Sequence, residues 1–186
     1  MQITETALPE VKLIRPVRHG DARGYFSEVY REDALRRAGV EIAFVQDNQS
    51  MSAPIGVLRG LHFQTPPMAQ AKLVRVIKGA IVDVAVDIRR GSPRFGRHVA
   101  VVLSAETGEQ LFVPEGFAHG FATLEPESTV LYKVNRYYSP EHDRGLLWND
   151  PALGIDWRLA GREPVLSDKD RRHPTLAELP AYFDYR

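Results

Sequence analysis

Between residues 43 and 134 the chain alternates short runs of β-branched and aromatic residues with Gly, Pro, Asn and Asp. Such runs, nearly evenly spaced and bounded by turn residues, are typical of an antiparallel sandwich or barrel. The strand–helix alternation of a parallel sheet is missing from this pattern. We therefore expect strands at Ala43–Val45, Val57–Gln64, Lys72–Lys78, Ala80–Asp87, Arg97–Leu103, Gln110–Val113, Gly116–Thr123 and Thr129–Val134.

The strand expected at Ala80–Asp87 has the clearest alternation. Its three valines share one face, while Asp83 and Asp87 lie on the other face together with Ile81 and Ala85. In an antiparallel sheet this pattern is typical of one core face and one partly solvated face.

The remaining segments predict little regular structure. Ser27–Ala38 predicts a helix, because basic residues gather near its end and Gly39 follows as a stop signal. The segment after Pro140 is rich in Trp, Asp, Pro and Arg, and we expect residues 140–186 to wrap around the barrel. The length of 186 residues fits one domain. We therefore expect a single, mainly β domain over residues 1–186, built as an antiparallel barrel or sandwich.

Composition and charge narrow the possible functions. Lys and Arg total 24, as do Asp and Glu, so the net charge of +0 predicts no general attraction to nucleic acid or anionic membranes. The sequence contains no cysteine, which excludes disulfides, iron–sulfur clusters and thiol nucleophiles. The N-terminus lacks the order of a signal peptide, and Asp83 and Asp87 interrupt the most apolar stretch. We therefore expect a cytoplasmic protein without a membrane span.

The densest group of reactive side chains is Arg59 and His62, followed by Lys72 and Arg75 on the next expected strand. Facing one cavity, three cations and an imidazole would bind a compact anion such as a diphosphate. The alternative is a solvated strand face with a hydrogen-bonded histidine. Strict alternation separates Arg59 from His62 unless Gly60 marks a bulge, so the faces of these two side chains stay open.

A second motif, Pro114-Glu115-Gly116-Phe117-Ala118-His119, resembles the second motif of the cupin superfamily. Metal-binding cupins need about three protein ligands, and their first motif resembles His-x-His followed by a glutamate. Here the corresponding stretch, His62-Phe63-Gln64, offers one imidazole and no carboxylate within the next five residues. We therefore expect a cupin-like barrel without a metal, and the ligand count argues against a metal-dependent oxygenase.

Tyrosines form a third group, with Tyr132 on the last expected strand and Tyr137 and Tyr138 just beyond it. A phenol can donate a proton at neutral pH, although each tyrosine alone could equally be core packing. In the tail, Ser167 could cap a helical turn that leads to Asp170.

Taken in chain order, these segments resemble the dTDP-4-dehydrorhamnose 3,5-epimerase family over the whole chain. The resemblance implies a metal-free cupin jelly roll that needs no cofactor. It also implies a homodimer in which an N-terminal segment, about residues 1–50, reaches into the neighbouring subunit. The stretches that carry the resemblance are residues 21–26, 44–48, 58–64, 72–75, 83–87, 114–121, 131–133, 138–140, 148–150 and 166–170.

The resemblance further implies roles for single residues. His62 is implied as the catalytic base, Asp170 as its carboxylate partner, Tyr132 as the general acid and Lys72 as the residue that stabilises an enolate oxygen. The implied substrate-binding residues are Arg23, Phe26, Glu28, Gln46, Asn48, Arg59, His119 and Tyr138.

The implied reaction is inversion of C3 and C5 of dTDP-4-dehydro-6-deoxy-D-glucose to give dTDP-4-dehydro-L-rhamnose, in dTDP-L-rhamnose biosynthesis. Inversion beside a ketone needs a base, a stabilised enolate and an acid on the opposite face. Three alternatives stay open at this point: an epimerase that inverts only C3 or C5 of a related nucleotide 4-keto-deoxysugar, a metal-dependent cupin, and a non-catalytic module that binds nucleotide sugars.

Overall fold

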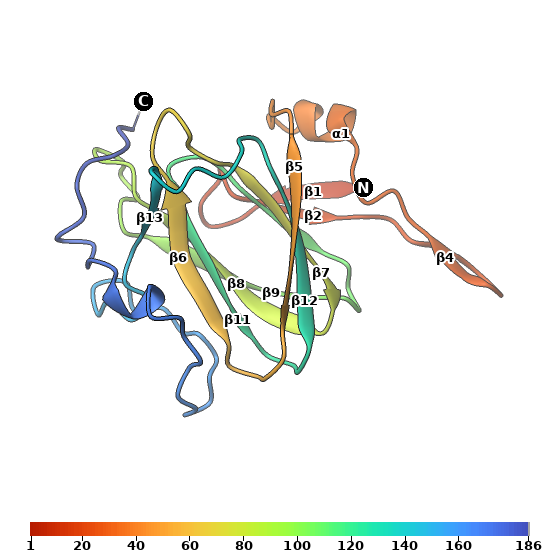
Figure 1. Ribbon diagram of the computed structural model, residues 1–186. Helices are drawn as coiled ribbons and strands as arrows, with labels where there is room; N and C mark the ends of the chain where they lie inside the picture. Colours follow the sequence, from red (N-terminus) through yellow and green to blue (C-terminus); the bar gives the residue numbers. More distant parts are fainter. Residues whose placement is uncertain (186) are drawn as a thin grey trace.

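The computed structural model describes residues 1–185 and is built mainly from two antiparallel sheets that face each other as a jelly-roll barrel (Figure 1). One sheet has six strands in the order β1-β2-β10-β7-β12-β5, and the other has five in the order β13-β6-β11-β8-β9. The expected mainly β, cupin-type fold is therefore confirmed.

The six-stranded sheet contains β1 (Gln2–Glu5), β2 (Lys12–Arg15), β5 (Gln46–Ser52), β7 (Lys72–Lys78), β10 (Gln110–Val113) and β12 (Ser128–Val134). The five-stranded sheet contains β6 (Leu58–Gln64), β8 (Ala80–Asp87), β9 (His98–Ser104), β11 (Phe117–Thr123) and β13 (Asp143–Gly145). Outside the barrel lie the hairpin β3 (His19–Asp21) and β4 (Gly24–Phe26), the helix α1 (Glu32–Arg37) and the 3₁₀ helix η1 (Asp170–Arg172).

Most central strands lie where the sequence predicts them, but two expectations near the N-terminus are wrong. Ala43–Val45 is not a strand; β5 begins at Gln46 instead. Its polar sequence alternates between exposed and half-buried positions and lacks the β-branched residues that mark a strand. Helix α1 is shorter than expected because the chain is still extended at Arg31, with φ −143° and ψ 112°.

Strand β8 is buried on both faces, so the expected solvated face is wrong. Ile81 and Ala85 pack inside the barrel, between the two sheets. The three valines pack on the outer side against residues of the C-terminal segment, including Leu153 and Trp157. That segment removes the outer face from water, while Asp83 points to the inner face, where it is a buried carboxyl group inside the barrel.

A bulge in β6 sets the orientation of its polar side chains. From Arg59 to His62 the strand takes three residue steps where the paired strand β11 takes two. The extra residue lets both side chains face the same cavity, which strict alternation would not allow. Gly60 has φ +132° and approaches β11 so closely that a Cβ atom there would lie 2.6 Å from Gly120 Cα. The sequence-based hypothesis of a bulge at Gly60 is thus confirmed.

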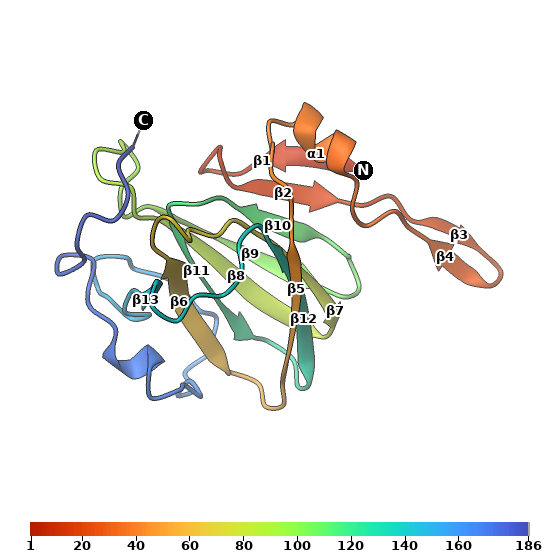
Figure 2. The ribbon, with the colours of Figure 1, turned by 45° about the horizontal axis from the view of Figure 1, so that its top comes forward.

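The two ends of the chain lie on different sides of the barrel (Figures 1 and 2). The β3–β4 hairpin projects away from both sheets, and all of its strand residues are exposed. The C-terminal segment instead packs along the outer face of the five-stranded sheet and contributes β13 to its edge. Within residues 1–185, no helix is long and apolar enough to cross a membrane.

Candidate active site

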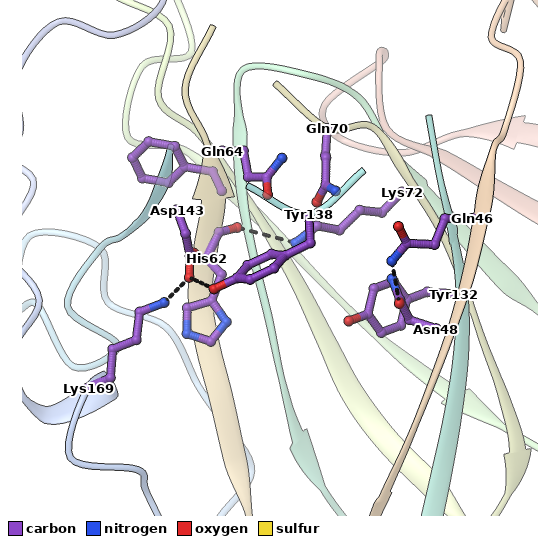
Figure 3. Close-up of a pocket in the computed structure, with 11 residues that line it drawn as sticks. Gln46, Asn48, His62, Gln64, Gln70, Lys72, Tyr132, Tyr138, Asp143 and Lys169 are labelled. Carbon is purple, nitrogen blue, oxygen red and sulfur yellow. Dashed lines mark hydrogen bonds and ion pairs between the residues drawn. The ribbon is translucent and has the colours of Figure 1, made fainter. Parts of the chain in front are cut away.

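The main polar cavity lies between the two sheets and consists of two adjoining hollows of about 260 and 240 Å³ (Figure 3). Both hollows are lined by His62, Lys72, Tyr132 and Lys169, so they form one continuous cleft. The first is also lined by Gln46, Asn48, Phe63, Gln64, Gln70, Tyr138 and Asp143. The second is also lined by Ser50, Arg59, His119, Phe121, Ser167 and Asp170.

The cleft gathers nine of the twelve candidate residues, because the lining includes all four catalytic candidates and five of the eight binding candidates. The other three, Arg23, Phe26 and Glu28, are exposed on or just after the projecting hairpin. Arg75, expected beside Lys72, is not part of the cleft. It lies on the opposite face of β7 and lines a separate hollow with Gln110. The expected cluster of Arg59, Lys72 and Arg75 is therefore wrong for Arg75, while Arg59 and Lys72 do face the cleft.

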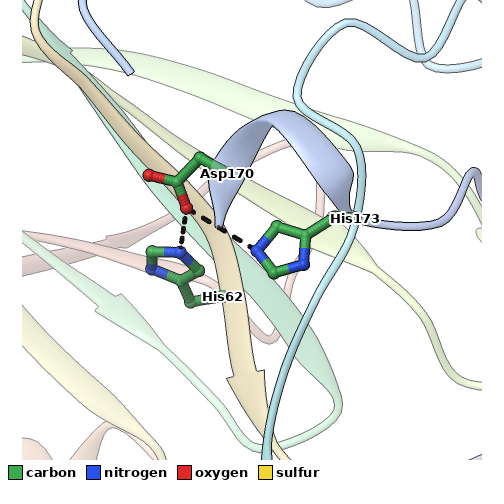
Figure 4. A group of neighbouring side chains, drawn as sticks. All are labelled: His62, Asp170 and His173. Carbon is green, nitrogen blue, oxygen red and sulfur yellow. Dashed lines mark hydrogen bonds and ion pairs between the residues drawn. The ribbon is translucent and has the colours of Figure 1, made fainter. Parts of the chain in front are cut away.

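His62 is held by Asp170, which comes from the C-terminal segment (Figure 4). Nε2 of His62 lies 2.5 Å from Oδ1 of Asp170. The other carboxylate oxygen accepts a hydrogen bond of 2.8 Å from the Ser167 hydroxyl, and the Ser167 oxygen accepts one of 3.2 Å from the Asp170 N–H. The turn expected at Ser167 therefore exists, and it fixes the carboxylate against the imidazole.

This environment sets the charges of the pair. Burial lowers the pKa of His62, and Lys72 and Lys169 lower it further, which together outweigh the upward effect of Asp170. Burial alone would raise the pKa of Asp170, but His173, His62 and Ser167 stabilise the charged form and hold that pKa far below its usual range. At neutral pH the site thus offers a neutral imidazole, whose Nε2–H points at an ionised carboxylate and whose Nδ1 can accept a proton.

Lys72 is a buried cation on the wall formed by β7. Its Nζ lies 3.5 Å from the backbone oxygen of His62. Burial lowers its pKa to about 8, although Asp83 and Asp143 act in the opposite direction. At pH 7 Lys72 is therefore protonated in most molecules. Its charge is poorly solvated, which favours interaction with a nearby anion.

Tyr132 lies on β12, in the sheet opposite to that of His62 (Figure 3). Burial raises the pKa of its phenol and Asp143 adds to this, while Arg59 lowers it. The net effect keeps the proton on the oxygen at neutral pH. The cleft therefore has a proton acceptor on one wall and a proton donor on the other.

Arg59 and His119 complete the deeper hollow. Arg59 is held by hydrogen bonds to Ser52 Oγ at 3.2 Å and to the backbone oxygen of Met51 at 3.3 Å. His119 is buried, and its Nε2 lies 2.7 Å from Asp83 Oδ1. This contact fixes the imidazole ring and leaves its other nitrogen available to a ligand.

Sequence reasoning missed several residues of the cleft. Lys169 forms an ion pair with Asp143, and Tyr138 donates a hydrogen bond of 3.1 Å to the same carboxylate (Figure 3). Gln64 and Gln70 line the same hollow. Asp143 begins the three-residue strand β13 and Lys169 directly precedes η1, and both elements are too short for a strand or helix period to have indicated the direction of these side chains.

One group of side chains could in principle hold a metal ion. The ligand atoms of His62, Asp170 and His173 lie within 4.8 Å of one another. Three cations, namely Arg59, Lys72 and Lys169, line the hollow that Asp170 and His62 face. Their charges disfavour a divalent cation there, so these residues fit an anionic ligand better than a metal.

Comparisons with known proteins agree with this geometry. The dTDP-4-dehydrorhamnose 3,5-epimerase of Sinorhizobium fredii is 55% identical over 185 residues, covering 100% of this chain and 94% of the relative. The crystal structure of the Bacillus anthracis dTDP-4-dehydrorhamnose 3,5-epimerase, with TDP and PPi bound, has a TM-score of 0.90 at 50% identity, covering 94% of this chain and 98% of that one.

A Legionella pneumophila dTDP-6-deoxy-D-glucose-3,5-epimerase, solved in complex with dTDP-4-keto-L-rhamnose, has a TM-score of 0.94 at 43% identity and covers 100% of this chain and 98% of that one. A family model described as dTDP-4-dehydrorhamnose 3,5-epimerase matches residues 5–178. With nearly its whole length matched in sequence and in fold, the chain belongs to the dTDP-4-dehydrorhamnose 3,5-epimerase family.

Proposed function

We propose that this chain inverts C3 and C5 of dTDP-4-dehydro-6-deoxy-D-glucose to give dTDP-4-dehydro-L-rhamnose. The observation that carries the proposal is the pairing of His62 with Asp170 on one wall of the cleft and the placement of Tyr132 on the other. Family membership supports the substrate class, because the relatives carry this activity in their names and one is solved with the 4-keto sugar nucleotide.

In the proposed reaction, Nδ1 of His62 removes the proton from the carbon beside the 4-keto group. The electron pair of the broken C–H bond moves to the ketone oxygen and forms an enolate. Asp170 stabilises the imidazolium that results, and Lys72 stabilises the enolate oxygen. The enolate then collapses back to a ketone as its carbon takes the phenolic proton of Tyr132 from the opposite face, which inverts the centre. The proton held by His62 leaves to solvent, and Tyr132 regains one.

Three cations suit the charge of the proposed substrate. Arg59, Lys72 and Lys169 line the cleft, and together they can neutralise a diphosphate and the developing enolate. His119 can contact the sugar or the diphosphate through its free nitrogen. We assign the remaining lining side chains on the outer side, Gln46, Asn48 and Tyr138, to the nucleotide sugar as well.

We also propose that the chain acts as a homodimer and that residues 1–186 form one domain. The hairpin β3–β4 carries Tyr25 and Phe26, which are 61% and 67% exposed, on an arm that projects away from both sheets. Exposed aromatic residues on a projecting arm are typical of an interaction site. In the dimer, Arg23, Phe26 and Glu28 would reach the nucleotide in the partner's cleft.

Subunit complementation tests the shared site. A variant with Arg23→Ala and Phe26→Ala should be inactive, and so should His62→Ala. In a mixed dimer, the barrel with an intact His62 receives an intact arm from the other chain. Mixing the two variants after partial unfolding and refolding should therefore restore activity to some of the sites. An inactive mixture, despite mixed dimers detected by native mass spectrometry, would contradict arm exchange.

The central test is incubation with dTDP-4-dehydro-6-deoxy-D-glucose in D₂O, followed by proton NMR. The proposal expects deuterium at both C3 and C5, with no effect of a chelator. Exchange at one carbon only would indicate a single-site epimerase, and binding without exchange would indicate a binding module. His62→Ala should bind the nucleotide yet take up no deuterium; full exchange by this variant would remove His62 as the base. Cytoplasmic nucleotide-sugar synthesis is the setting we propose, consistent with the absence of cysteine.

A further inference from the structure

His173 lies directly behind the His62–Asp170 pair, at the end of η1 (Figure 4). Its backbone is extended, with φ −66° and ψ 150°, as expected for a residue that precedes a proline. The carbonyl of Pro174 then accepts a hydrogen bond of 2.8 Å from the Leu147 N–H, which ties this turn to the end of β13. The local sequence therefore ends the helix and directs the imidazole back toward Asp170.

The ring of His173 fills a slot that a glycine leaves open. A Cβ atom on Gly145 would lie 2.3 Å from both Cε1 and Nε2 of His173, so the ring occupies the space of the missing side chain. Gly145 pairs with His62 across β13 and β6. The two imidazole rings consequently meet edge to face, with centroids 5.6 Å apart and planes at 79°. Packing on both sides restricts the ring to this position.

The nitrogen that faces the carboxylate has no other partner. Nε2 of His173 is buried without a hydrogen bond, and it lies 3.6 Å from Asp170 Oδ1, the oxygen bound by His62 at 2.5 Å. A buried N–H without an acceptor is costly, and its free energy improves if it can donate to a neighbouring carboxylate. A shift of a few tenths of an ångström would complete that hydrogen bond.

We propose that His173 is a positioning residue that keeps Asp170 ionised and correctly oriented while His62 carries the abstracted proton. The inference rests on the proposed role of His62 as the base. His173 is not among the described residues that line the cleft, so it acts through Asp170 and not on the substrate. One carboxylate oxygen is then shared by two imidazoles, of which only His62 reaches the sugar.

Because His62 and His173 share one oxygen of Asp170, His173 affects the basicity of His62. An N–H from His173 takes up part of the negative charge of Asp170 and opposes transfer of the proton from His62 to the carboxylate. Without that donor the full carboxylate charge acts on His62, which becomes more basic. The other titratable or charged groups around His62 come from β6, β7, β11, β12, β13 and the loops on either side of β13. They are Arg59, Lys72, His119, Tyr132, Tyr138, Asp143 and Lys169. These groups are the same in all variants below.

The test compares His173→Phe, which keeps a ring but removes the N–H, with His173→Gln, which restores an N–H donor at a similar position. The midpoint of His62 is measured by NMR titration of the free protein, and kcat and KM are measured against pH. For His173→Phe we expect the midpoint to rise by about half a unit or more and kcat to fall about tenfold, with KM unchanged. His173→Gln should stay close to the wild type in both readouts.

Gly145→Ala provides a second, independent variant, because the added methyl group displaces the His173 ring without altering Asp170. It should shift the His62 midpoint upward in the same way. A wild-type midpoint and kcat in His173→Phe would overturn the proposal, and so would a His173→Gln variant as impaired as His173→Phe. The titration needs no substrate, so it tests His173 even if the wild-type protein exchanges no keto sugar, a result that would instead refute the proposed function.

Discussion

Replacing Gly60 by alanine perturbs the close approach of β6 to β11 at the bulge between Arg59 and His62. The new Cβ would lie 2.6 Å from Gly120 Cα and 2.9 Å from the backbone oxygen of His119. Normal contacts between carbon atoms are about 3.5–4.0 Å, so one of the strands must move by about 1 Å. Both obstructing atoms belong to the backbone and cannot rotate away. The shift would also move Arg59 and His62, which flank Gly60.

The cost has two parts. Overpacking of this kind destabilises by about 1–3 kcal/mol. At φ +132° an alanine adds backbone strain of about 1–3 kcal/mol. We therefore expect Gly60→Ala to lower the free energy of unfolding by about 2–6 kcal/mol, which for a chain of this size corresponds to a fall in Tm of about 4–24 °C.

Urea unfolding followed by circular dichroism, at equal protein concentrations, measures this change. Gly154→Ala is the matched control: Gly154 also has a positive φ, of +59°, but nothing lies within 4 Å of its Cβ position. The control should lose only about 1–2 kcal/mol. If Gly60→Ala is no less stable than Gly154→Ala, the close approach of β6 and β11 does not constrain the site, and the reasoning fails.

Three further substitutions test single groups in the cleft. Lys72→Met should lower kcat about 10²- to 10³-fold. It should also raise the free energy of unfolding at pH 7 by up to about 3 kcal/mol. Burial lowers the pKa of Lys72 from 10.5 to about 8, and at pH 7 the lysine is protonated in both the folded and the unfolded chain, so the wild-type folded state carries the cost of a buried charge that methionine removes. This advantage should narrow as the pH rises from 8 to 10.5, because over that range the folded lysine has lost its proton while the unfolded lysine still holds one; an equal advantage at pH 7 and 11 would contradict the assignment. Asp170→Asn removes a charge-assisted hydrogen bond of about 1.5–3 kcal/mol and should reduce kcat about 10- to 150-fold, while Asp168→Asn, on the exposed side of the same turn, should have no effect. Tyr132→Phe should reduce kcat about 10²- to 10⁴-fold with little change in KM, with the exposed Tyr137→Phe as its control, and a variant that releases inverted product at the normal rate would exclude Tyr132 as the acid.

Sequence patterns were informative where a strand is rich in apolar residues and much less so where it is polar. The strands that carry His62, Lys72 and Tyr132 have enough β-branched and apolar residues to mark their positions. By contrast, β5 is polar at all but one position. The short strands β1 and β13 lie at sheet edges, β2 lies next to β1, and β3 and β4 lie outside the barrel; pairing rather than periodicity defines these strands.

Which side chains meet in the cleft could not be predicted from local sequence patterns either. Lys72 and Arg75 look like neighbours in the sequence, yet they are three positions apart on β7, an odd offset that places them on opposite faces. Asp170 could be paired with His62 only through the family resemblance, because no local rule connects residues 108 positions apart. His173 gave no signal at all, since its role depends on the slot beside Gly145.

The order of the catalytic groups along the chain affects when, during its own synthesis, the protein can become active. The strands that carry His62, Lys72 and Tyr132 are all synthesised by residue 134, whereas Asp170 is synthesised 36 residues later. A nascent or truncated chain that ends between these points would have a base without its counterion. It would also leave the outer face of β8 uncovered. Catalytic competence and the shielding of that apolar surface therefore arrive together, which ties the onset of turnover to synthesis of the segment that carries Asp170.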